Sequence, residues 1–444
     1  MFISQPKKNL MKKCYFVLVS FLVMGFFLWT ENSPSQAQAS ENSIPDESNT
    51  APNYAESEAI VKIDSPQAAF QIAQKENLIV SPILPAGDDQ NLYVMKSPEQ
   101  KPVEKILKDV KKNPAVKSAQ PNFKYKPLAS VTDDKYYAQQ WSLSPTYRIA
   151  GGVDAESAWG TEAKKQTNLV IGVIDTGVNY NHKDLKKNLS KGKAKGRNIN
   201  RPKNKPTDSD GHGTFLAGII AAVTKNKTGI AGASYYNHLR VMPLKFDFTT
   251  DQAITAINYA KSKGVPIINA SWGSYGDEGL DLVLKDTIAN YPGVFVTAAG
   301  NGDDEGNGYN HDGADPNQKM YPCDFDLPNI ICVGASDRDG NLAYYSDYGA
   351  TSVDVVAPGG TDDDDIVGLS NKKSGYVSAE GSSLSAAFVT AEAGLLLSKK
   401  PTLSNVQIIQ IIENSVDSNA SLAGKIKSGG KVNFKKALDL AATY

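Results

Sequence analysis

Four short runs of almost uninterrupted apolar residues constrain the fold of this chain more than any other feature. These runs occupy residues 169–174, 265–270, 294–299 and 330–334. Strands that are buried on both faces read in this way, because neither face carries polar side chains. Helical spacing occurs between them, at 251–263 and 280–290. This alternation predicts an α/β fold with three layers, in which helices cover both faces of a mostly parallel sheet, from residue 140 to 444.

Composition narrows the class of partner. Hydrophobic residues make up 41% of the 444 residues and charged residues 21%, which is ordinary for a soluble globular protein. The formal net charge is −1, so the chain has no basic excess for binding nucleic acid or an anionic membrane surface. We therefore expect no nucleic-acid partner.

The N-terminus has the pattern of an export signal. Four lysines among residues 7–13 precede an apolar run at 15–29, which is short for a membrane span. The small residues Ala37 and Ala39 then mark a cleavage site. We expect a signal peptide at 1–39 and a polar linker at 40–53, and hence a secreted protein with no stable membrane anchor. An uncleaved anchor is the alternative.

Residues 54–126 have the pattern of a small separate domain. Strand patterns at 59–63 and 92–95, helix patterns at 66–76 and 103–112, and an extended stretch at 116–122 follow one another. This order suits a compact β-α-β-β-α-β unit, an α+β ferredoxin-like domain. The polar stretch 127–139 reads as a tether, and exposed tethers of this kind are where proteolysis concentrates.

Three residues with complementary chemistry lie at the ends of predicted elements. Asp175 ends the first apolar strand, His212 opens a predicted helix, and Ser383 opens another. The carboxyl ends of parallel strands are where open α/β sheets bind ligands. A serine hydroxyl needs a base to become a nucleophile, a neutral histidine supplies one, and a carboxylate orients the imidazole. Each residue alone is more simply a cap or a loop residue, and only the combination indicates catalysis.

Together these segments resemble the subtilisin-like (S8) serine peptidases. Asp-Thr-Gly, His-Gly-Thr and Gly-x-Ser occur in that family's order, Asp before His before Ser, and the resemblance covers the chain from Gln140 to the C-terminus. It implies that Asp175 orients the imidazole, that His212 is general base and then acid, and that Ser383 is the nucleophile. The protein would then be a secreted serine endopeptidase that needs no cofactor for its chemistry and acts on proteins or peptides.

The resemblance also assigns the surroundings of the triad. The segment at 298–301 matches the oxyanion segment, in which Asn301 would donate its side-chain amide to the tetrahedral intermediate. The other residues implied to bind substrate are Ser271, Trp272, Gly273, Ala299, Gly300 and Tyr321. The first three match a segment that pairs with substrate as an extra strand. Tyr321 begins a segment, 321–323, that matches the wall of the pocket for the residue before the cleaved bond.

Residues 54–126 resemble the inhibitory propeptide of these enzymes, especially at 113–122. The resemblance implies a zymogen in which this domain acts as an intramolecular inhibitor. It also implies self-cleavage between about Lys126 and Lys135, which would leave a peptidase domain at 140–444.

One departure from the family pattern bears on the reaction. Ala387 stands where proline usually follows the nucleophile. A less constrained acyl-enzyme would accept amines as well as water, so a transpeptidase or peptide ligase is one alternative. A catalytically silent peptide-binding pseudo-enzyme is another.

Two further sites are expected. Cys323 and Cys332 form an even pair once the signal peptide is removed, which predicts a disulfide, with two buried thiols as the alternative. The resemblance to the family suggests a structural calcium ion bound through Asp184. The positively charged Lys225 and Lys227 in the neighbouring loop disfavour a bound cation. The acidic stretch 303–315 is a second calcium candidate.

Overall fold

The computed structural model describes residues 54–83, 91–123, 132–143, 150–159, 169–234, 238–276 and 281–444. They belong to two compact units, which divide between Ser130 and Val131. The predicted signal peptide at 1–39 and linker at 40–53 lie outside the described residues, as does the tether from 127 to 131. None of the described helices is both long enough and apolar enough to cross a bilayer.

The smaller unit follows the predicted β-α-β-β-α-β order. Its elements are β1 (Tyr54–Ile63), α2 (Pro66–Lys75), β2 (Ile79–Pro82), β3 (Leu92–Lys96), α3 (Val103–Val110) and β4 (Val116–Phe123). The strands form one antiparallel sheet in the order β2-β3-β1-β4. Apolar side chains of both helices and of the two central strands pack together as its core, with Ile72, Ile106 and Met95 among them.

The larger unit is built on a sheet of nine strands among the described residues, in the order β16-β17-β13-β12-β10-β8-β5-β7-β6. The strands are β5 (Leu169–Asp175), β6 (Arg197–Asn198), β7 (Leu239–Lys245), β8 (Ile267–Ala270), β10 (Val294–Ala298), β12 (Ile330–Ser336), β13 (Val355–Pro358), β16 (Asp417–Ser418) and β17 (Gly430–Lys431). All neighbours pair in parallel except β16 with β17. The four apolar runs of the sequence became β5, β8, β10 and β12.

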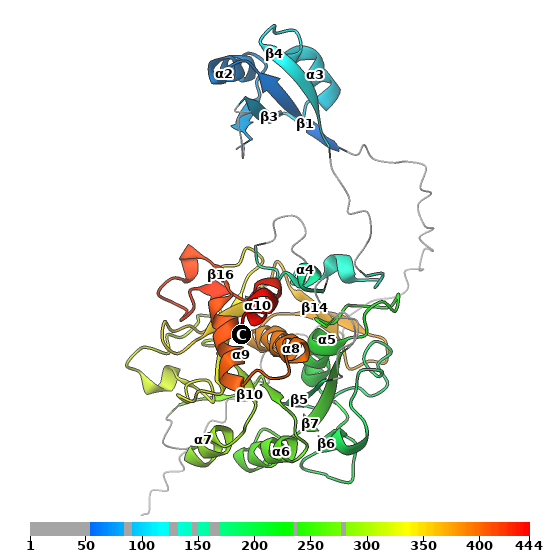
Figure 1. Ribbon diagram of the computed structural model, residues 1–444, viewed down its shortest axis with the longest axis vertical. Helices are drawn as coiled ribbons and strands as arrows, with labels where there is room; N and C mark the ends of the chain where they lie inside the picture. The colour runs from blue at the N-terminus through cyan, green and yellow to red at the C-terminus, as the bar shows by residue number, and fades with distance from the viewer. Residues whose placement is uncertain are drawn as a thin grey trace, which may run out of the picture. The chain divides into compact units, whose positions relative to one another are not determined.

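Helices cover both faces of this sheet (Figure 1). They are α4 (Ala155–Trp159), α5 (His212–Ala221), α6 (Thr250–Ser262), α7 (Leu282–Ala289), α8 (Ser382–Lys399), α9 (Asn405–Asn414) and α10 (Phe434–Ala441). Alternate side chains of β5 enter opposite cores: Ile171 and Val173 pack with α5 and α8, whereas Ile174 packs with α6 and α7. This explains why β5 lacks polar alternation, because both of its faces are buried.

Short elements complete the larger unit. Strands β9 (Ser274–Tyr275) and β11 (Met320–Tyr321) pair with each other, as do β14 (Ile366–Leu369) and β15 (Tyr376–Ala379). Four 3-10 turns are also present among the described residues: η1 (Tyr137–Gln139), η2 (Gly192–Ala194), η4 (Pro316–Gln318) and η5 (Ala420–Leu422).

The tether predicted at 127–139 is too long. Its described part, from residue 132 onward, packs against the larger unit. The two carboxylate oxygens of Asp134 accept hydrogen bonds from the backbone N–H groups of Lys225 and Asn226, each at 2.9 Å. These bonds satisfy donors of a tight loop that would otherwise lack partners, so the larger unit begins before Gln140.

Candidate active site

The predicted acid and base meet in the structure. Nδ1 of His212 lies 2.9 Å from Oδ1 and 3.0 Å from Oδ2 of Asp175. Asp175 is completely buried at the end of β5, and His212 is the first residue of α5. A buried carboxylate on Nδ1 fixes the imidazole tautomer, so that Nε2 is free to accept a proton.

Local sequence explains this close approach. Oδ1 of Asp175 also accepts the backbone N–H of Thr176 at 2.7 Å, which fixes the carboxylate. The Thr176 hydroxyl in turn accepts the N–H of Gly213 at 2.9 Å, so the helix start rests on the strand end. A side chain at Gly213 would lie 2.2 Å from the carbonyl oxygen of Gly177. Glycine therefore follows His212 because no Cβ fits there.

Neighbouring acids tune the basicity of His212. Burial lowers the pKa of His212, but the charge and hydrogen bond of Asp175 act in the opposite direction, with help from Asp210 and Asp208. The net result is a pKa above the ordinary histidine value. The imidazole is therefore a stronger base than a solvated histidine.

Ser383 is the second residue of α8 and is tied to the strand β8. Its hydroxyl lies 3.4 Å from the carbonyl oxygen of Ser271, and the Ser271 hydroxyl donates to the carbonyl of Ser383 at 2.9 Å. Within the described part of the chain, no hydrogen bond joins Ser383 to His212. Catalytic hydrogen bonds are often long in enzymes without substrate, and tighten in the reacting complex.

Asn301 is held in one orientation by the residue before Ser383. Its side-chain carbonyl oxygen accepts the backbone N–H of Ser382 at 2.9 Å and the Ser382 hydroxyl at 2.8 Å. The same hydroxyl accepts the N–H of Gly300 at 3.2 Å. With the oxygen engaged, the two N–H groups of the Asn301 amide remain as donors next to the start of α8.

The predicted substrate-binding segments also converge. Ser271, Trp272 and Gly273 lead from β8 into β9, which pairs with β11 and so lies beside Tyr321. Gly273 is required by this contact, since its Cβ would lie 2.6 Å from the carbonyl oxygen of Tyr321.

Two of these residues do not offer their side chains to a substrate. The Trp272 indole is buried, with Nε1 donating to the carbonyl of Ile174 at 2.9 Å. The Ala299 side chain is fully buried in a cluster with Cys323 and Met320. Trp272 can therefore offer a substrate only its backbone, and the Ala299 side chain belongs to the core.

The surroundings of Asp184 do not fit a calcium ion. One carboxylate oxygen accepts the side-chain N–H of Asn226 at 2.6 Å, and the other accepts the backbone N–H of Ile230 at 2.9 Å and the Tyr376 hydroxyl at 3.4 Å. Calcium needs six to eight oxygen ligands, whereas these groups are donors that already satisfy the carboxylate. Burial raises the pKa of Asp184 to about 7.

The acidic stretch 303–315 does not form a calcium cage from its carboxylates. Asp303 accepts backbone N–H groups of its own loop, Asp312 binds Thr351 and Ser352, and Asp315 caps η4. Across the described ranges, the single group of three acidic, histidine or cysteine side chains close enough to hold a metal is His311, Cys323 and Asp324, of which only His311 belongs to this stretch.

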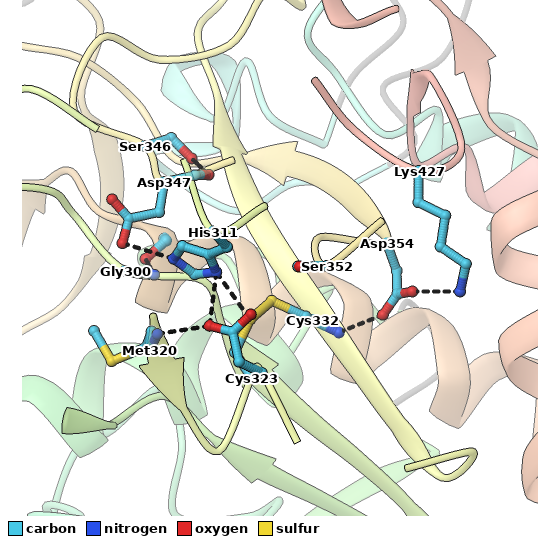
Figure 2. The surroundings of a disulfide bond; sticks show 12 residues. Gly300, His311, Met320, Cys323, Cys332, Ser346, Asp347, Ser352, Asp354 and Lys427 are labelled. Atoms are coloured by element: carbon cyan, nitrogen blue, oxygen red, sulfur yellow. Dashed lines mark hydrogen bonds and ion pairs between the residues drawn. A yellow bond between two sulfur atoms is a disulfide. The ribbon is translucent and has the colours of Figure 1, made fainter. Parts of the chain in front are cut away.

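Cys323 and Cys332 are joined by a disulfide, as predicted (Figure 2). The bond links the turn after β11, which carries Tyr321, to the central strand β12. Cys332 is held at the other end as well, because its backbone N–H donates to Asp354 at 2.8 Å.

Sequence reasoning missed several residues that hold this site. Ser382 orients Asn301, although no sequence pattern singles it out. The Tyr275 hydroxyl accepts the backbone N–H of Asn301 at 3.2 Å, and lies only two residues beyond the segment that was singled out. His311 gave no signal, because neither a strand end nor a glycine frame flanks it in the sequence.

Comparison with known proteins identifies the family. A model of the subtilase family, peptidase S8, matches residues 166–434. The thermophilic serine proteinase of Bacillus sp. (strain AK1) is 32% identical over 344 residues, which cover 76% of each chain. Thermitase of Thermoactinomyces vulgaris is 33% identical over 290 residues, covering 64% of this chain and 93% of thermitase.

Comparison with solved structures supports the same fold. A protease of Pseudoalteromonas arctica PAMC 21717 superposes with a TM-score of 0.58 at 25% identity, over 70% of this chain and all of that one. The resemblance drawn from the triad motifs is thereby confirmed, together with the subtilisin-like fold. The chain belongs to the subtilase family and is a subtilisin-like serine endopeptidase, a hydrolase that acts on peptide bonds.

Proposed function

We propose that the chain cleaves peptide bonds through an acyl-enzyme formed on Ser383. Neutral His212 takes the hydroxyl proton through Nε2, while Asp175 holds Nδ1 and stabilises the imidazolium that results. His212 then returns the proton to the departing amine. Water repeats these steps and releases the acyl group as a carboxylic acid.

The hydroxyl of Ser383 must turn for this reaction. It faces the Ser271 carbonyl at 3.4 Å, a long and therefore weak contact. Turning a serine side chain toward His212 costs little, because its staggered rotamers interconvert quickly. The carbonyl of Ser383 stays bonded to the Ser271 hydroxyl, so the backbone of the nucleophile remains fixed.

The oxyanion of the tetrahedral intermediate would be stabilised by Asn301. Its amide is already oriented by Ser382, so no reorganisation is needed when charge develops on the substrate oxygen. Loss of one such donor costs about 2.7–4 kcal/mol of transition-state stabilisation.

The observation that carries the proposal is the pairing of His212 Nδ1 with both oxygens of buried Asp175. The decisive test is Ser383→Ala compared with Ser421→Ala, which removes an exposed hydroxyl in η5. We expect Ser383→Ala to lose at least a thousandfold in kcat on a peptide ester and to resist labelling by a sulfonyl fluoride, whereas Ser421→Ala keeps both properties. Near wild-type turnover by Ser383→Ala would refute the role of Ser383.

We further infer that the enzyme is exported and matures from a zymogen. Residues 1–39 have signal-peptide character, and residues 54–126 resemble an inhibitory propeptide. The match to the Bacillus serine proteinase covers a larger share of the chain than Val131–Tyr444 provides, so it includes part of the smaller unit. Since Asp134 is bound to the larger unit, we place self-cleavage between Lys126 and Val131.

The two alternatives receive less support. Ala387 is fully buried within α8 and packs in the main core, so it offers no added room beside an acyl group. A transpeptidase would convert a peptide ester and an amine into an amide, and we expect hydrolysis product alone. The paired acid and base, and the oriented Asn301, weigh against a silent pseudo-enzyme.

A further inference from the structure

A second acid–base cluster lies next to the proposed oxyanion site. His311 is completely buried, with Nδ1 at 3.0 Å from Asp324 and Nε2 at 3.2 Å from Asp347. Figure 2 shows His311 between Asp347 and the turn that carries Cys323. Both ring nitrogens therefore face carboxylates, so both act as donors when the ring is protonated.

The cluster reaches the oxyanion segment through one tyrosine. The Tyr275 hydroxyl donates to Oδ2 of Asp347 at 2.7 Å. Its oxygen accepts the backbone N–H of Asn301 at 3.2 Å and that of Gly302 at 3.1 Å. The backbone N–H of Asp347 also donates to the carbonyl of Gly300 at 3.2 Å. Together, these hydrogen bonds fix the backbone of residues 300–302, which carries the Asn301 side chain.

The other end of the cluster holds the pocket wall. Asp324 accepts the backbone N–H of Met320 at 2.6 Å through the same oxygen that faces His311. Met320 is the first residue of β11 and precedes Tyr321. One histidine thus ties together the oxyanion segment and the wall of the pocket for the residue before the cleaved bond.

This cluster does not form a metal site. His311, Cys323 and Asp324 lie close enough to ligate an ion, but Cys323 is in the disulfide and has no thiolate to offer. The two nitrogens of His311 are both engaged by carboxylates. A protonated ring fits this arrangement better than a metal ion does.

The charge of the ring follows from its neighbours. Burial lowers the pKa of His311, but the hydrogen bonds and charges of Asp324 and Asp347 more than compensate and raise it to about 9. A buried cation between two carboxylates gives each a partner, whereas removing the cation would leave two buried charges unpaired. The three side chains therefore act as a unit.

Gly300 shows how closely the cluster supports the oxyanion segment. Its φ is +120°, and a Cβ there would lie 2.1 Å from Oδ2 of Asp347 and 2.5 Å from the Tyr275 hydroxyl. The side chains of the cluster occupy the space where any other residue would place its own. The backbone next to Asn301 is thus packed directly on Asp347 and Tyr275.

We propose that His311 is a positioning residue for catalysis, which acts through Asp347 and Tyr275 to hold the main chain of Asn301 where its side chain meets the oxyanion. The inference rests on the proposed role of Asn301. It assigns a function to the buried Asp324–His311–Asp347 cluster, which neither the triad nor the pocket requires for its own chemistry.

The test is Tyr275→Phe, with Tyr309→Phe as the matched control. Tyr275→Phe keeps the ring and removes the hydroxyl that links the cluster to Asn301. The Tyr309 ring packs on Tyr275 at 5.2 Å between centroids, and only its backbone N–H contacts the cluster. We expect Tyr275→Phe to lower kcat by roughly 10- to 100-fold with KM within about twofold, because small displacements of a catalytic donor are costly. Tyr309→Phe should leave both constants unchanged.

A transition-state analogue separates positioning from general damage. A peptide aldehyde adds to Ser383 and places an oxyanion at Asn301, whereas the amine-side product peptide, which carries no acyl group at the cleaved bond, does not. Tyr275→Phe should weaken binding of the aldehyde by the same factor by which it lowers kcat. Its affinity for the product should be unchanged. Equal loss of both affinities, or unchanged aldehyde binding, would overturn the inference. His311→Gln should also weaken binding of the aldehyde. Labelling by a sulfonyl fluoride measures the fraction of this variant that is folded.

A double-mutant cycle distinguishes this inference from the proposed function. If Tyr275 acts through Asn301, adding Tyr275→Phe to Asn301→Ala should reduce kcat by less than twofold further. Full additivity would refute the positioning role while leaving Asn301 in place. If Asn301→Ala itself leaves aldehyde binding unchanged, the oxyanion assignment fails instead.

Discussion

Single side chains decide the geometry of the proposed site, and Ser382 is the clearest case. Its hydroxyl donates to the Asn301 oxygen and accepts the N–H of Gly300, so one serine joins α8 to the segment after β10. Without it, the Asn301 amide would keep one of its two orienting bonds, from the backbone N–H of Ser382. The residue before the nucleophile is thus as much a part of the oxyanion site as Asn301.

Replacing Ser382 should therefore affect turnover more than binding. We expect Ser382→Ala to lower kcat by about tenfold, because the amide that meets the oxyanion becomes less well oriented. Ser382→Thr keeps the hydroxyl and should stay within about twofold of wild type. Steady-state kinetics on one peptide substrate provide the comparison, and equal kcat values for the two variants would contradict it.

Acids near His212 predict a particular pH profile. His212 must be neutral to accept a proton, so activity falls as the pH drops below its pKa, which Asp175, Asp210 and Asp208 help to raise. Asp210→Asn removes one of these charges, lowers the pKa of His212, and should move the acidic limb of kcat/KM to lower pH. Asp439→Asn, on α10, is the charge-matched control and should leave the limb in place. A shift toward higher pH would contradict the assignment.

The triad could be proposed from sequence because each of its residues belongs to a local pattern. A buried strand ends at Asp175, and glycines frame the helix starts at His212 and Ser383, so neighbouring sequence specifies each position. His311 has no such frame. Its partners, Asp324 and Asp347, come from separate loops without periodicity, and only the folded chain brings them together.

At the scale of elements, long apolar strands were predictable and short pairings were not. The runs that became β5, β8, β10 and β12 are buried on both faces, and burial leaves a strong pattern in sequence. Strands β9 and β11 have two residues each, too few for any periodicity. These two strands nonetheless place the predicted substrate segment beside Tyr321, so their pairing was the least predictable part of the candidate site.

The loop at 225–230 replaces a cation with hydrogen-bond donors, which has a testable consequence. Asp184 keeps its proton in the folded state up to a pKa of about 7, whereas an unfolded aspartate loses it near 3.8. Its contribution to stability is complete below about pH 4 and is lost as the pH rises through 7. In a Ser383→Ala background, urea unfolding should show this decline, and Asp184→Asn should remove it.

Removing calcium with a chelator tests whether an ion stabilises the folded protein. If donors satisfy Asp184, then EDTA should leave the urea midpoint unchanged, and added calcium should not raise it. A calcium-dependent rise in the midpoint would mean that an ion binds the folded state. That outcome would restore the family's calcium site at Asp184.

For the molecule as a whole, the two units should act as inhibitor and enzyme. We expect residues 54–126, added as a separate chain, to inhibit the processed enzyme and to slow substrate cleavage competitively. The same segment lacking residues 124–126, which follow β4, should inhibit less, because propeptides of this family leave their C-terminal tail in the active cleft. Progress curves with a peptide substrate give the inhibition constants, and equal potency of both segments would contradict the arrangement.

The position of α8 also governs when activity can first arise during synthesis. This helix is buried along most of its length, and it packs against β8, β10, β12 and β13 while carrying the nucleophile at its start. Until the ribosome releases these residues, the chain lacks the helix that packs on β8, β10, β12 and β13, so much of one face of its sheet is uncovered. The protein therefore completes its fold and gains its proposed nucleophile in the same step. We expect a truncated chain that ends before Ser382 to be unfolded and inactive as a peptidase.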